Sequence, residues 1–488
     1  PPSAAAAVMP VWVTVEIPAE AAPGDYAGFL QLGSHRIPVK LTVAPWLCPE
    51  PGAMDTHVGL VPSTESLARS YKTPAWSEEH WKLIEQELKL LGKTGADDLW
   101  VHALWYLGYN TGNTAMLRFT RDGDRIVPDF SIIDRYFELY RTHCSKPQFV
   151  IVMVWTGNPR GRRGRPPKPE VHVVVDGEKA AVPRVHGPGG QAIWKPALDG
   201  IRRRVDAMGW DEDSILLGLA YDNRPSKDEV AGFKAIGPYG RWAIWTHGRG
   251  EKRYHSVKAG EPYVFSNGME IGYYAHPYTP NISAWVRGGP RVRMGNVEGG
   301  ILGGWRMPVN VYTTTRNDIH KYHALTQWRG YATGTSIGGY GMDSEAKGFA
   351  FIWFDWFTNA TGYTPFMSRA CDGMNRNNSP ALIAPGPEGP LATVRYEMFR
   401  EGIQEAEARR RIEKALVNEA VEDDTADAAR SFLEKQIDIR FQNGKFKGGH
   451  AGGNLGKPER MWAFAPYPEW QVNTLRLFEH AAAVSGAD

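Results

Sequence analysis

The sequence contains little cysteine, little net charge and no long apolar run. Among its 488 residues there are 3 Cys, and the formal net charge is +2. Cys48, Cys144 and Cys371 lie far apart and fit no metal-ligand spacing, so we expect isolated buried thiols. So small a charge gives no reason to expect a nucleic acid or an anionic membrane as partner. No stretch reaches the about 18 consecutive apolar residues of a transmembrane helix, so we expect no membrane span.

The common signatures of cofactor, metal and nucleophile sites are also missing. The Gly-rich segment 299–304 lacks the strand and helix that frame a dinucleotide fingerprint. The acidic segment 423–427 lacks the Gly and the distal Glu of a calcium loop and is better explained as a helix N-terminus. No nucleophile elbow marks a Ser/His/Asp triad. We therefore expect no cofactor and no metal.

Aromatic residues, in contrast, are plentiful. The chain has 18 Trp, 20 Tyr and 18 Phe beside 53 Gly and 35 Pro. This mixture is typical of a loop-rich enzyme with a wide, aromatic-lined cleft, because aromatic faces stack on sugar rings as well as filling cores. The alternative, that most of these Trp residues are core, stays open. A length of 488 residues predicts a large domain with one or two smaller ones.

The N-terminal region, residues 1–45, has the pattern of an antiparallel β-sandwich. Apolar and polar residues alternate over 11–17, 26–32 and 37–43, with a Pro-Gly-Asp turn at 23–25. Three strands are thin for independent stability, so we expect more of this module to precede residue 1. Residues 45–51 are the predicted linker.

From residue 54 to 374 the pattern alternates between strand and helix. About seven such units over nearly 300 residues predict a (β/α)8 TIM-like barrel. The expected strands are 98–105, 148–155, 214–221, 241–246, 262–266, 308–313 and 335–342, and the expected helices are 131–142, 194–208 and 318–331.

A Pro/Gly-rich stretch at 375–390 is predicted to hold no regular element and to end this domain. A C-terminal helical appendage over 391–488 is expected to follow it. Its predicted helices are 393–420, 423–436 and 470–484, with a Gly-rich loop at 444–456.

The strand predicted at 214–221 stops abruptly at Asp222-Asn223-Arg224-Pro225. In barrels and open α/β sheets the carboxyl end of such a strand is where catalytic side chains lie. Asp222 is therefore the first catalytic candidate, although its neighbour Asn223 is an amide and not a second acid.

Two stretches resemble glycoside hydrolase family 123 and its relatives. The first is 382–390, Leu-Ile-Ala-Pro-Gly-Pro-Glu-Gly-Pro, followed by 395–405, Arg-Tyr-Glu-Met-Phe-Arg-Glu-Gly-Ile-Gln-Glu, which is similar to the family's closing helix. The second is the opening 10–28, which looks like its N-terminal sandwich. Tyr312 and the segment Tyr340-Gly-Met-Asp343 fit the same layout, so the resemblance spans nearly the whole chain.

The resemblance implies a β-N-acetylhexosaminidase-type retaining mechanism assisted by the 2-acetamido group of the substrate. The family places an Asp-Glu pair at the end of the fourth strand, where Asp orients the acetamido nitrogen and Glu protonates the leaving oxygen. Asp222 matches the first member, whereas Asn223 stands at the second and cannot act as a general acid. Three interpretations stay open: a proton donor elsewhere, for which Glu270, Glu298 and Asp343 are the candidates; a different substrate and catalytic pair; or a degenerate site that only binds sugar.

Other residues at or beyond predicted strand ends are candidates for substrate binding. An Arg-rich loop at 160–168, beginning with Arg160, follows the strand that ends at Trp155. Arg side chains match sulfate and carboxylate groups bidentately, although a solvated loop without a ligand is the plainer interpretation. The sugar-lining candidates are Trp105, Trp155, His247 and Tyr273, and for His247 a structural role is favoured over acid/base catalysis.

The sequence thus predicts a glycoside hydrolase acting on an amino-sugar-containing or anionic glycan. Its partner would be an oligosaccharide or polysaccharide, sulfated in one interpretation, with no nucleic acid and no membrane. The alternative is a catalytically degenerate carbohydrate-binding or surface protein. The family resemblance implies a bacterial protein that is secreted or periplasmic. The sugar, the linkage and the oligomeric state do not follow from the sequence.

Overall fold

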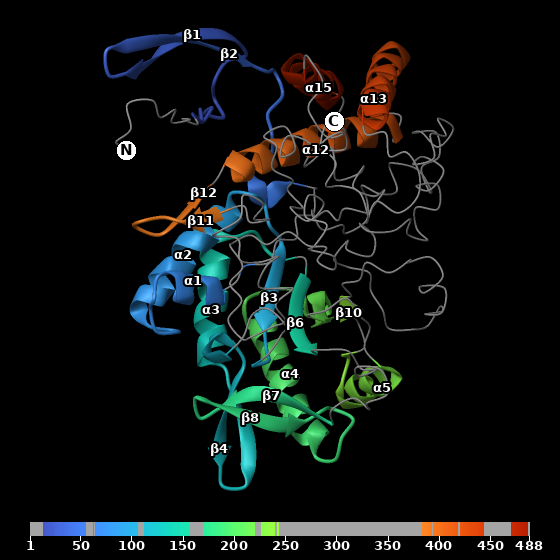
Figure 1. The fold of residues 1–488 in the computed structure, drawn as a ribbon. Coiled ribbons are helices and arrows are strands. Elements are labelled where there is room, and N and C mark those ends of the chain that lie inside the picture. The colour runs from blue at the N-terminus through green and yellow to red at the C-terminus, as the bar shows by residue number, and fades with distance from the viewer. Residues whose placement is uncertain are drawn as a thin grey trace.

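We describe the protein from a computed structural model (Figure 1). The structure describes residues 13–54, 62, 64–105, 112–147, 149–155, 169–219, 226–239, 242–243, 383–392, 394–417, 420–443 and 470–486. Every statement below concerns these residues.

A parallel four-stranded sheet forms the centre of the described chain. Its order is β10-β9-β6-β3, and all three neighbouring pairs are parallel (Figure 1). The strands are β3 (Asp98–His102), β6 (Phe149–Trp155), β9 (Ile215–Leu219) and β10 (Trp242–Ala243). Val150, Ile151, Val152 and Met153 are wholly buried, as expected for a strand covered on both faces. The sheet is open over these strands. The strands predicted at 262–266, 308–313 and 335–342 lie outside the described residues, so a closed barrel is not part of the described fold.

Helices alternate with these strands along the chain. They are α1 (Thr64–Ser70), α2 (Glu78–Gly92), α3 (Ser131–His143), α4 (Gly190–Ala207) and α5 (Lys227–Ile236), with short 3₁₀ turns η1 (Pro51–Ala53), η2 (Gly112–Thr114) and η3 (Glu212–Ser214). The side chain of Ser77 accepts a hydrogen bond from the His80 N–H and so caps α2. One continuous apolar core joins these helices to the strands. The strand and helix expectations between residues 98 and 219 are confirmed in kind, with ends shifted by a few residues.

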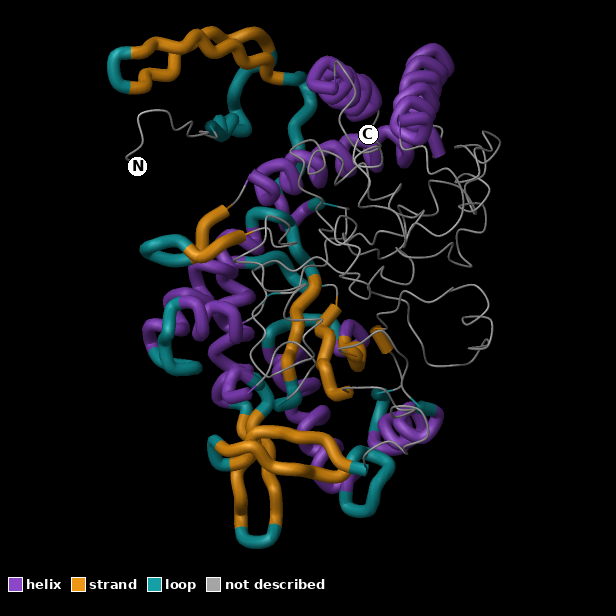
Figure 2. The backbone as a smooth tube through the Cα atoms, viewed as in Figure 1, coloured by secondary structure: helices purple, strands orange, loops and turns teal. Residues whose placement is uncertain are grey.

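Two β-hairpins inserted between the β/α elements form a second sheet, which the sequence analysis did not predict. The hairpins are β4 (Arg118–Asp122) with β5 (Arg125–Asp129), and β7 (Glu170–Val175) with β8 (Glu178–Pro183). They join through a parallel contact between β4 and β7, giving the order β5-β4-β7-β8 (Figure 2).

Turn chemistry explains both hairpins. The first turn has Gly123 at φ 58°, and the second has Asp176 at φ 49° followed by Gly177 at φ 83°. In the second turn both central residues have positive φ, the type I′ geometry that Asp-Gly sequences favour. In the first turn only Gly123, the first central residue, has positive φ, which is the type II′ geometry. The Asp176 carboxylate also accepts a hydrogen bond from the Arg121 N–H at 3.1 Å, which ties the second turn to β4.

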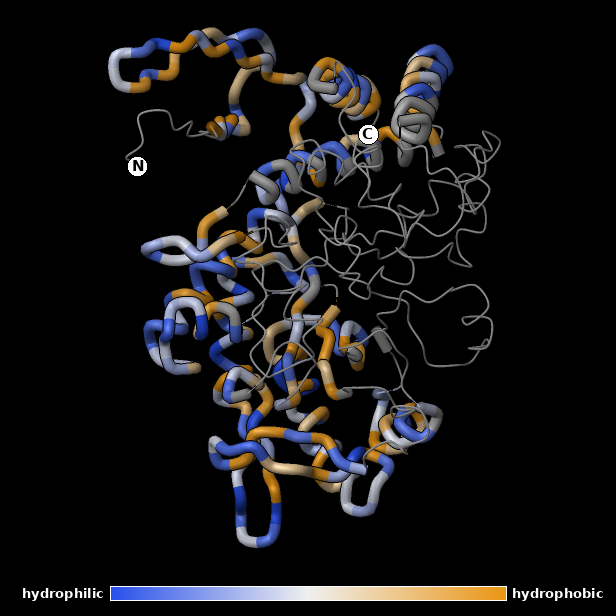
Figure 3. Tube along the Cα trace, in the orientation of Figure 1, coloured by the Kyte–Doolittle hydropathy of each residue, from blue (hydrophilic) through white to orange (hydrophobic). Residues whose placement is uncertain are grey.

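The N-terminal region is a single hairpin of β1 (Gly24–Leu32) and β2 (His35–Val43). Apolar and polar residues alternate along it (Figure 3). Large apolar side chains such as Phe29 stay exposed. The strand predicted over 11–17 is wrong for residues 13–17, which hold no regular structure. A strand needs a hydrogen-bonding neighbour, and within the described residues β1 and β2 pair only with each other.

Three helices and one short hairpin make up the described C-terminal region. The hairpin consists of β11 (Ile383–Pro385) and β12 (Pro390–Ala392), and the helices are α12 (Val394–Val417), α13 (Asp423–Asn443) and α15 (Trp470–Ser485). The prediction that 375–390 holds no regular element is therefore wrong for the part of this hairpin that it covers. The prolines are tolerated because the strands are short and the turn is closed by a hydrogen bond from the Gly386 N–H to the Gly389 carbonyl. The helix predictions here are confirmed.

The C-terminal region is fastened to the central domain by hydrogen bonds at two tyrosines. The hydroxyl of Tyr396, on α12, donates to the Leu90 carbonyl at 2.7 Å. The hydroxyl of Tyr71 accepts from the Gly386 N–H at 2.9 Å. The helices also have a small apolar core of their own, which includes Ile412 and Leu477.

Candidate active site

The carboxyl ends of the central strands meet along one edge of the sheet. His102 of β3 is paired in register with Met153 of β6, Met153 with Gly218 of β9, and Gly218 with Ala243 of β10. Residues paired in register on parallel strands point to the same face, so these four form one row across the sheet. The segment that carries Asp222 leaves this edge, because it begins directly after Leu219.

Gly218 lets β9 lie close to β6 at this edge. A Cβ at Gly218 would lie 2.8 Å from the Ile151 Cγ2 atom and 3.3 Å from the Met153 Cγ atom. Real Cβ contacts are longer than the first of these distances, so a larger residue here would push the two strands apart. Gly218 lies within the strand predicted at 214–221, but the sequence pattern gives no sign of this close approach.

Only two of the residues predicted for the site belong to the described chain. Trp105 follows the end of β3, is partly buried, and donates its backbone N–H to the His172 carbonyl at 2.8 Å. Trp155 is the last residue of β6, and its backbone is paired with Leu219. Both therefore belong to the predicted edge of the sheet. The others lie outside the described residues: Asp222, Asn223, Glu298, Asp343, Arg160, His247, Glu270, Tyr273 and Tyr312.

His102 is a residue of this edge that sequence reasoning missed. Its side chain is 1% exposed, and burial lowers its pKa to about 3. The imidazole is therefore neutral at physiological pH and does not supply a positive charge to the site. The only signal in the sequence was a His inside the apolar run of 98–105, which an ordinary core histidine would also give.

The sheet formed by the two inserted hairpins flanks the same edge. β4 and β5 follow β3, and β7 and β8 follow β6, so both insertions leave from carboxyl ends of central strands (Figures 1 and 2). The bond from Trp105 to His172 joins the end of β3 directly to β7. The inserted sheet therefore lies beside the carboxyl ends of the central strands, where loops of α/β enzymes commonly contact substrate.

The start of α5 fixes the far end of the segment that carries Asp222. Ser226 and Glu229 form a capping box, in which the Ser226 hydroxyl accepts from the Glu229 N–H at 3.2 Å. The Glu229 carboxylate in turn accepts from the Ser226 N–H at 3.0 Å. Residues 220–225 are thus bounded by a paired strand on one side and a capped helix on the other.

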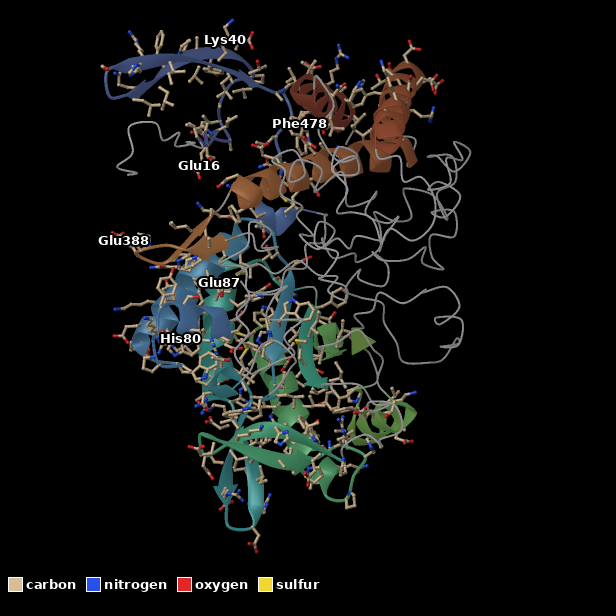
Figure 4. The ribbon with its side chains drawn as sticks, in the orientation of Figure 1. Glu16, Lys40, His80, Glu87, Glu388 and Phe478 are labelled. Carbon is tan, nitrogen blue, oxygen red and sulfur yellow. The ribbon has the colours of Figure 1, made fainter. Side chains whose placement is uncertain are left out.

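Other buried titratable groups lie away from this edge. His80 and Glu87 are both on α2, within the helical layer (Figure 4).

In the part of the chain that the structure describes, no three His, Cys, Asp or Glu side chains are grouped so as to hold a metal ion. No helix among the described residues is long and apolar enough to cross a membrane.

The parallel sheet and the helices that alternate with its strands define an α/β domain, and the comparisons with known proteins assign it to the glycosidases. Residues 63–236 match the family model described as glycoside hydrolase 123, catalytic domain. That range includes β3, β6, β9 and the whole of α5, together with Asp222 and Asn223. The resemblance to glycoside hydrolase family 123 is thereby confirmed.

A solved structure has a similar fold. It is a family 123 glycoside hydrolase from Clostridium perfringens, studied for the details of glycolipid glycan hydrolysis. The two chains share 15% identity with a TM-score of 0.58, and the alignment covers 96% of this chain and 78% of that one. At this identity the likeness concerns the fold. A search of curated proteins found no match.

Proposed function

We propose that this protein hydrolyses glycosidic bonds in amino-sugar-containing glycans by a substrate-assisted, retaining mechanism. One observation carries the proposal. Within the residues that match the glycoside hydrolase 123 catalytic domain, the chain passes from the carboxyl end of β9 through Asp222 to the capped start of α5. An acidic residue at the carboxyl end of a central strand is placed for catalysis in folds of this type.

The chemistry divides into two steps. In the first, the carbonyl oxygen of the 2-acetamido group attacks the anomeric carbon, the bond to the leaving oxygen breaks, and an acid protonates that oxygen. Asp222 accepts a hydrogen bond from the acetamido N–H, which orients the group and stabilises the positive charge of the cyclic intermediate. In the second, water attacks the anomeric carbon and returns its proton to the conjugate base of the acid.

The proton donor is a separate residue in this proposal. Asn223 hydrogen-bonds substrate but has no acidic proton to transfer. Glu270, Glu298 and Asp343 are the carboxylic acids that we propose for this role, and of these Asp343 directly follows the strand predicted at 335–342. Trp105 and Trp155 would stack on sugar rings at the same edge.

The substrate class is an oligosaccharide carrying an amino sugar. The Clostridium perfringens enzyme with the similar fold was studied for glycolipid glycan hydrolysis. The amino sugar proposed here comes instead from the family resemblance of the sequence. The Arg-rich loop that begins at Arg160 favours glycans that also carry sulfate or carboxylate groups, because guanidinium pairs with such anions through two parallel hydrogen bonds.

The test is turnover of chromogenic β-N-acetylhexosaminides and of sulfated and unsulfated glycans. We expect the Asp222→Asn variant to lose activity by about a hundredfold or more, as for removal of one preorganised charge-stabilising group. Asp228→Asn is the matched control, since Asp228 is an exposed carboxylate on the first turn of α5. Equal activity of wild type and Asp222→Asn would contradict the proposal.

The second candidate function is sugar binding without catalysis, and the identity of Asn223 favours it. A protein of this kind would bind glycans saturably on an array and release no product from any of them. The Asn223→Glu variant distinguishes the two functions further. In an enzyme with its donor elsewhere this change leaves turnover unchanged or lowers it, whereas in a degenerate site it creates turnover that the wild type lacks.

A further inference from the structure

The segment 184–186 lies between the start of α4 and the middle of α5. Two glycines make the close approach possible. A Cβ at Gly190, on α4, would lie 1.9 Å from the Arg184 carbonyl oxygen, and a Cβ at Gly232, on α5, would lie 2.9 Å from the Val185 Cγ1 atom. Val185 itself is 2% exposed. The end of the β7–β8 insertion is therefore packed directly against the helix that follows the Asp222 segment.

A buried ion pair reinforces this contact. The Arg184 guanidinium donates from Nη1 to the Glu229 Oε1 atom at 2.5 Å, and the two side chains are 10% and 3% exposed. The other carboxylate oxygen, Oε2, accepts from the N–H and hydroxyl of Ser226. One carboxylate thus holds both the N-cap of α5 and the cation that comes from the insertion.

The opposite end of α5 has a separate attachment to α4. The Tyr239 hydroxyl donates to the Asp199 carboxylate at 2.6 Å, and Lys195 donates to the other oxygen of that carboxylate at 2.7 Å. This second attachment lies beyond the C-terminal end of α5, away from residues 220–225. The helix is therefore fixed at both ends, and only one end adjoins the proposed catalytic segment.

We propose that Arg184 is a positioning residue for the catalytic reaction, acting through Glu229 and Ser226 on the segment that carries Asp222. The inference rests on the proposed function above. Leu219 is held by strand pairing and Ser226 by the capping box, and the Arg184–Glu229 pair fixes the start of α5 relative to the end of β8 and the start of α4. A displacement of about 1 Å in a catalytic group is enough to lower a rate by about a hundredfold.

The test compares two variants that disturb α5 at opposite ends. Arg184→Met with Glu229→Gln removes both charges together, and Gln keeps the capping box, so no buried charge is left behind. Tyr239→Phe is the matched control at the far end. At a temperature where all variants are folded, we expect the double variant to lose at least tenfold in kcat with KM changed less than threefold. Tyr239→Phe should lower the Tm but keep kcat within twofold of wild type.

A second measurement does not depend on activity. Hydrogen–deuterium exchange of the peptide covering 226–232, the start of α5, should be at least tenfold faster in the double variant than in wild type, and unchanged in Tyr239→Phe. Unchanged exchange and kcat in a folded double variant would overturn the inference, as would equal effects of the two variants. If wild type hydrolyses no glycan, the proposed function fails, and the exchange rates alone decide whether Arg184 fixes the start of α5.

Discussion

The Nδ1 atom of His80 accepts a hydrogen bond from the backbone N–H of Trp76 at 2.9 Å. Its Nε2 atom lies 2.8 Å from the Thr64 carbonyl oxygen and donates to it. The two bonds require the neutral imidazole with its proton on Nε2. Trp76 has φ 65°, a left-handed conformation that costs a residue with a Cβ about 1 kcal/mol or more. His80, on α2, thus holds a strained turn with a neutral ring (Figure 4).

This arrangement predicts a loss of stability in mild acid. Burial lowers the pKa of His80 to about 4, below the ordinary value of 6.5, so between these values the unfolded chain binds a proton that the folded chain does not. The contribution is complete above about pH 6.5, falls as the pH drops toward about 4, and amounts to about 3 kcal/mol in total. Urea unfolding at several pH values measures it.

The His80→Asn variant is the control for this pH dependence. Asn keeps an acceptor for the Trp76 N–H but does not titrate. The free energy of unfolding should depend less steeply on pH in the variant than in wild type. Some dependence will remain, because burial also lowers the pKa of His102, to about 3, and acts in the same direction. Identical slopes for the two proteins would contradict the assignment to His80.

Gly218→Ala should destabilise the central sheet by about 1–3 kcal/mol, the usual cost of overpacking a well-filled core. The reason is the 2.8 Å approach of the new Cβ to the Ile151 Cγ2 atom. Gly28→Ala is the matched control, since no atom lies within 4 Å of a Cβ built there. Thermal unfolding of both variants checks the prediction, which fails if Gly218→Ala is as stable as Gly28→Ala.

Two substitutions at Gly177, in the turn between β7 and β8, should lower the free energy of unfolding by different amounts, because they differ in how well they tolerate a positive φ. Gly177 has φ 83°, where a β-branched side chain is strained and Asn is tolerated. We expect Gly177→Val to lower the free energy of unfolding by about 1–2 kcal/mol and Gly177→Asn to lower it by less than half of that. Equal losses in the two variants, measured by chemical denaturation, would count against the type I′ turn.

Replacement of Trp105 should weaken substrate binding if the proposed function holds. The residue is partly buried at the end of β3, and loss of its ring removes a stacking face of about 1 kcal/mol. We expect Trp105→Ala to raise KM by about fivefold or more. Trp46→Ala is the matched control, because Trp46 is also partly buried but stacks on Phe478, at a ring distance of 5.3 Å, in the C-terminal region. A similar rise in KM for both variants would exclude a specific role.

Local patterns were sufficient to find most of the described elements. The unbroken apolar run at 149–155 formed β6, and the amphipathic pattern at 131–143 formed α3, since these signals depend on residues close in sequence. The hairpins β4–β5 and β7–β8 had a signal that was overlooked, the Gly-Asp pair at 123–124 and the Asp-Gly pair at 176–177 between alternating residues. The strand expected at 11–17 shows the opposite error, because alternation alone does not provide a pairing neighbour.

For the candidate site, the sequence located the strand end and the family resemblance, and it named Trp105 and Trp155 beside it. It did not identify Arg184 or Glu229 as partners, because 45 residues separate them along the chain. It gave no means to tell that His102 is buried deeply enough to stay neutral.

The sequence by itself determined the apolar strands, the helix caps, the turn residues and the glycosidase resemblance, all of which depend on neighbouring residues or on a short signature. The tertiary structure alone decided that β4 joins β7, that β9 needs Gly218 beside Ile151, and that Arg184 meets Glu229. These contacts bring together residues far apart in the chain, and their energies come from packing distance and burial, which no local pattern encodes.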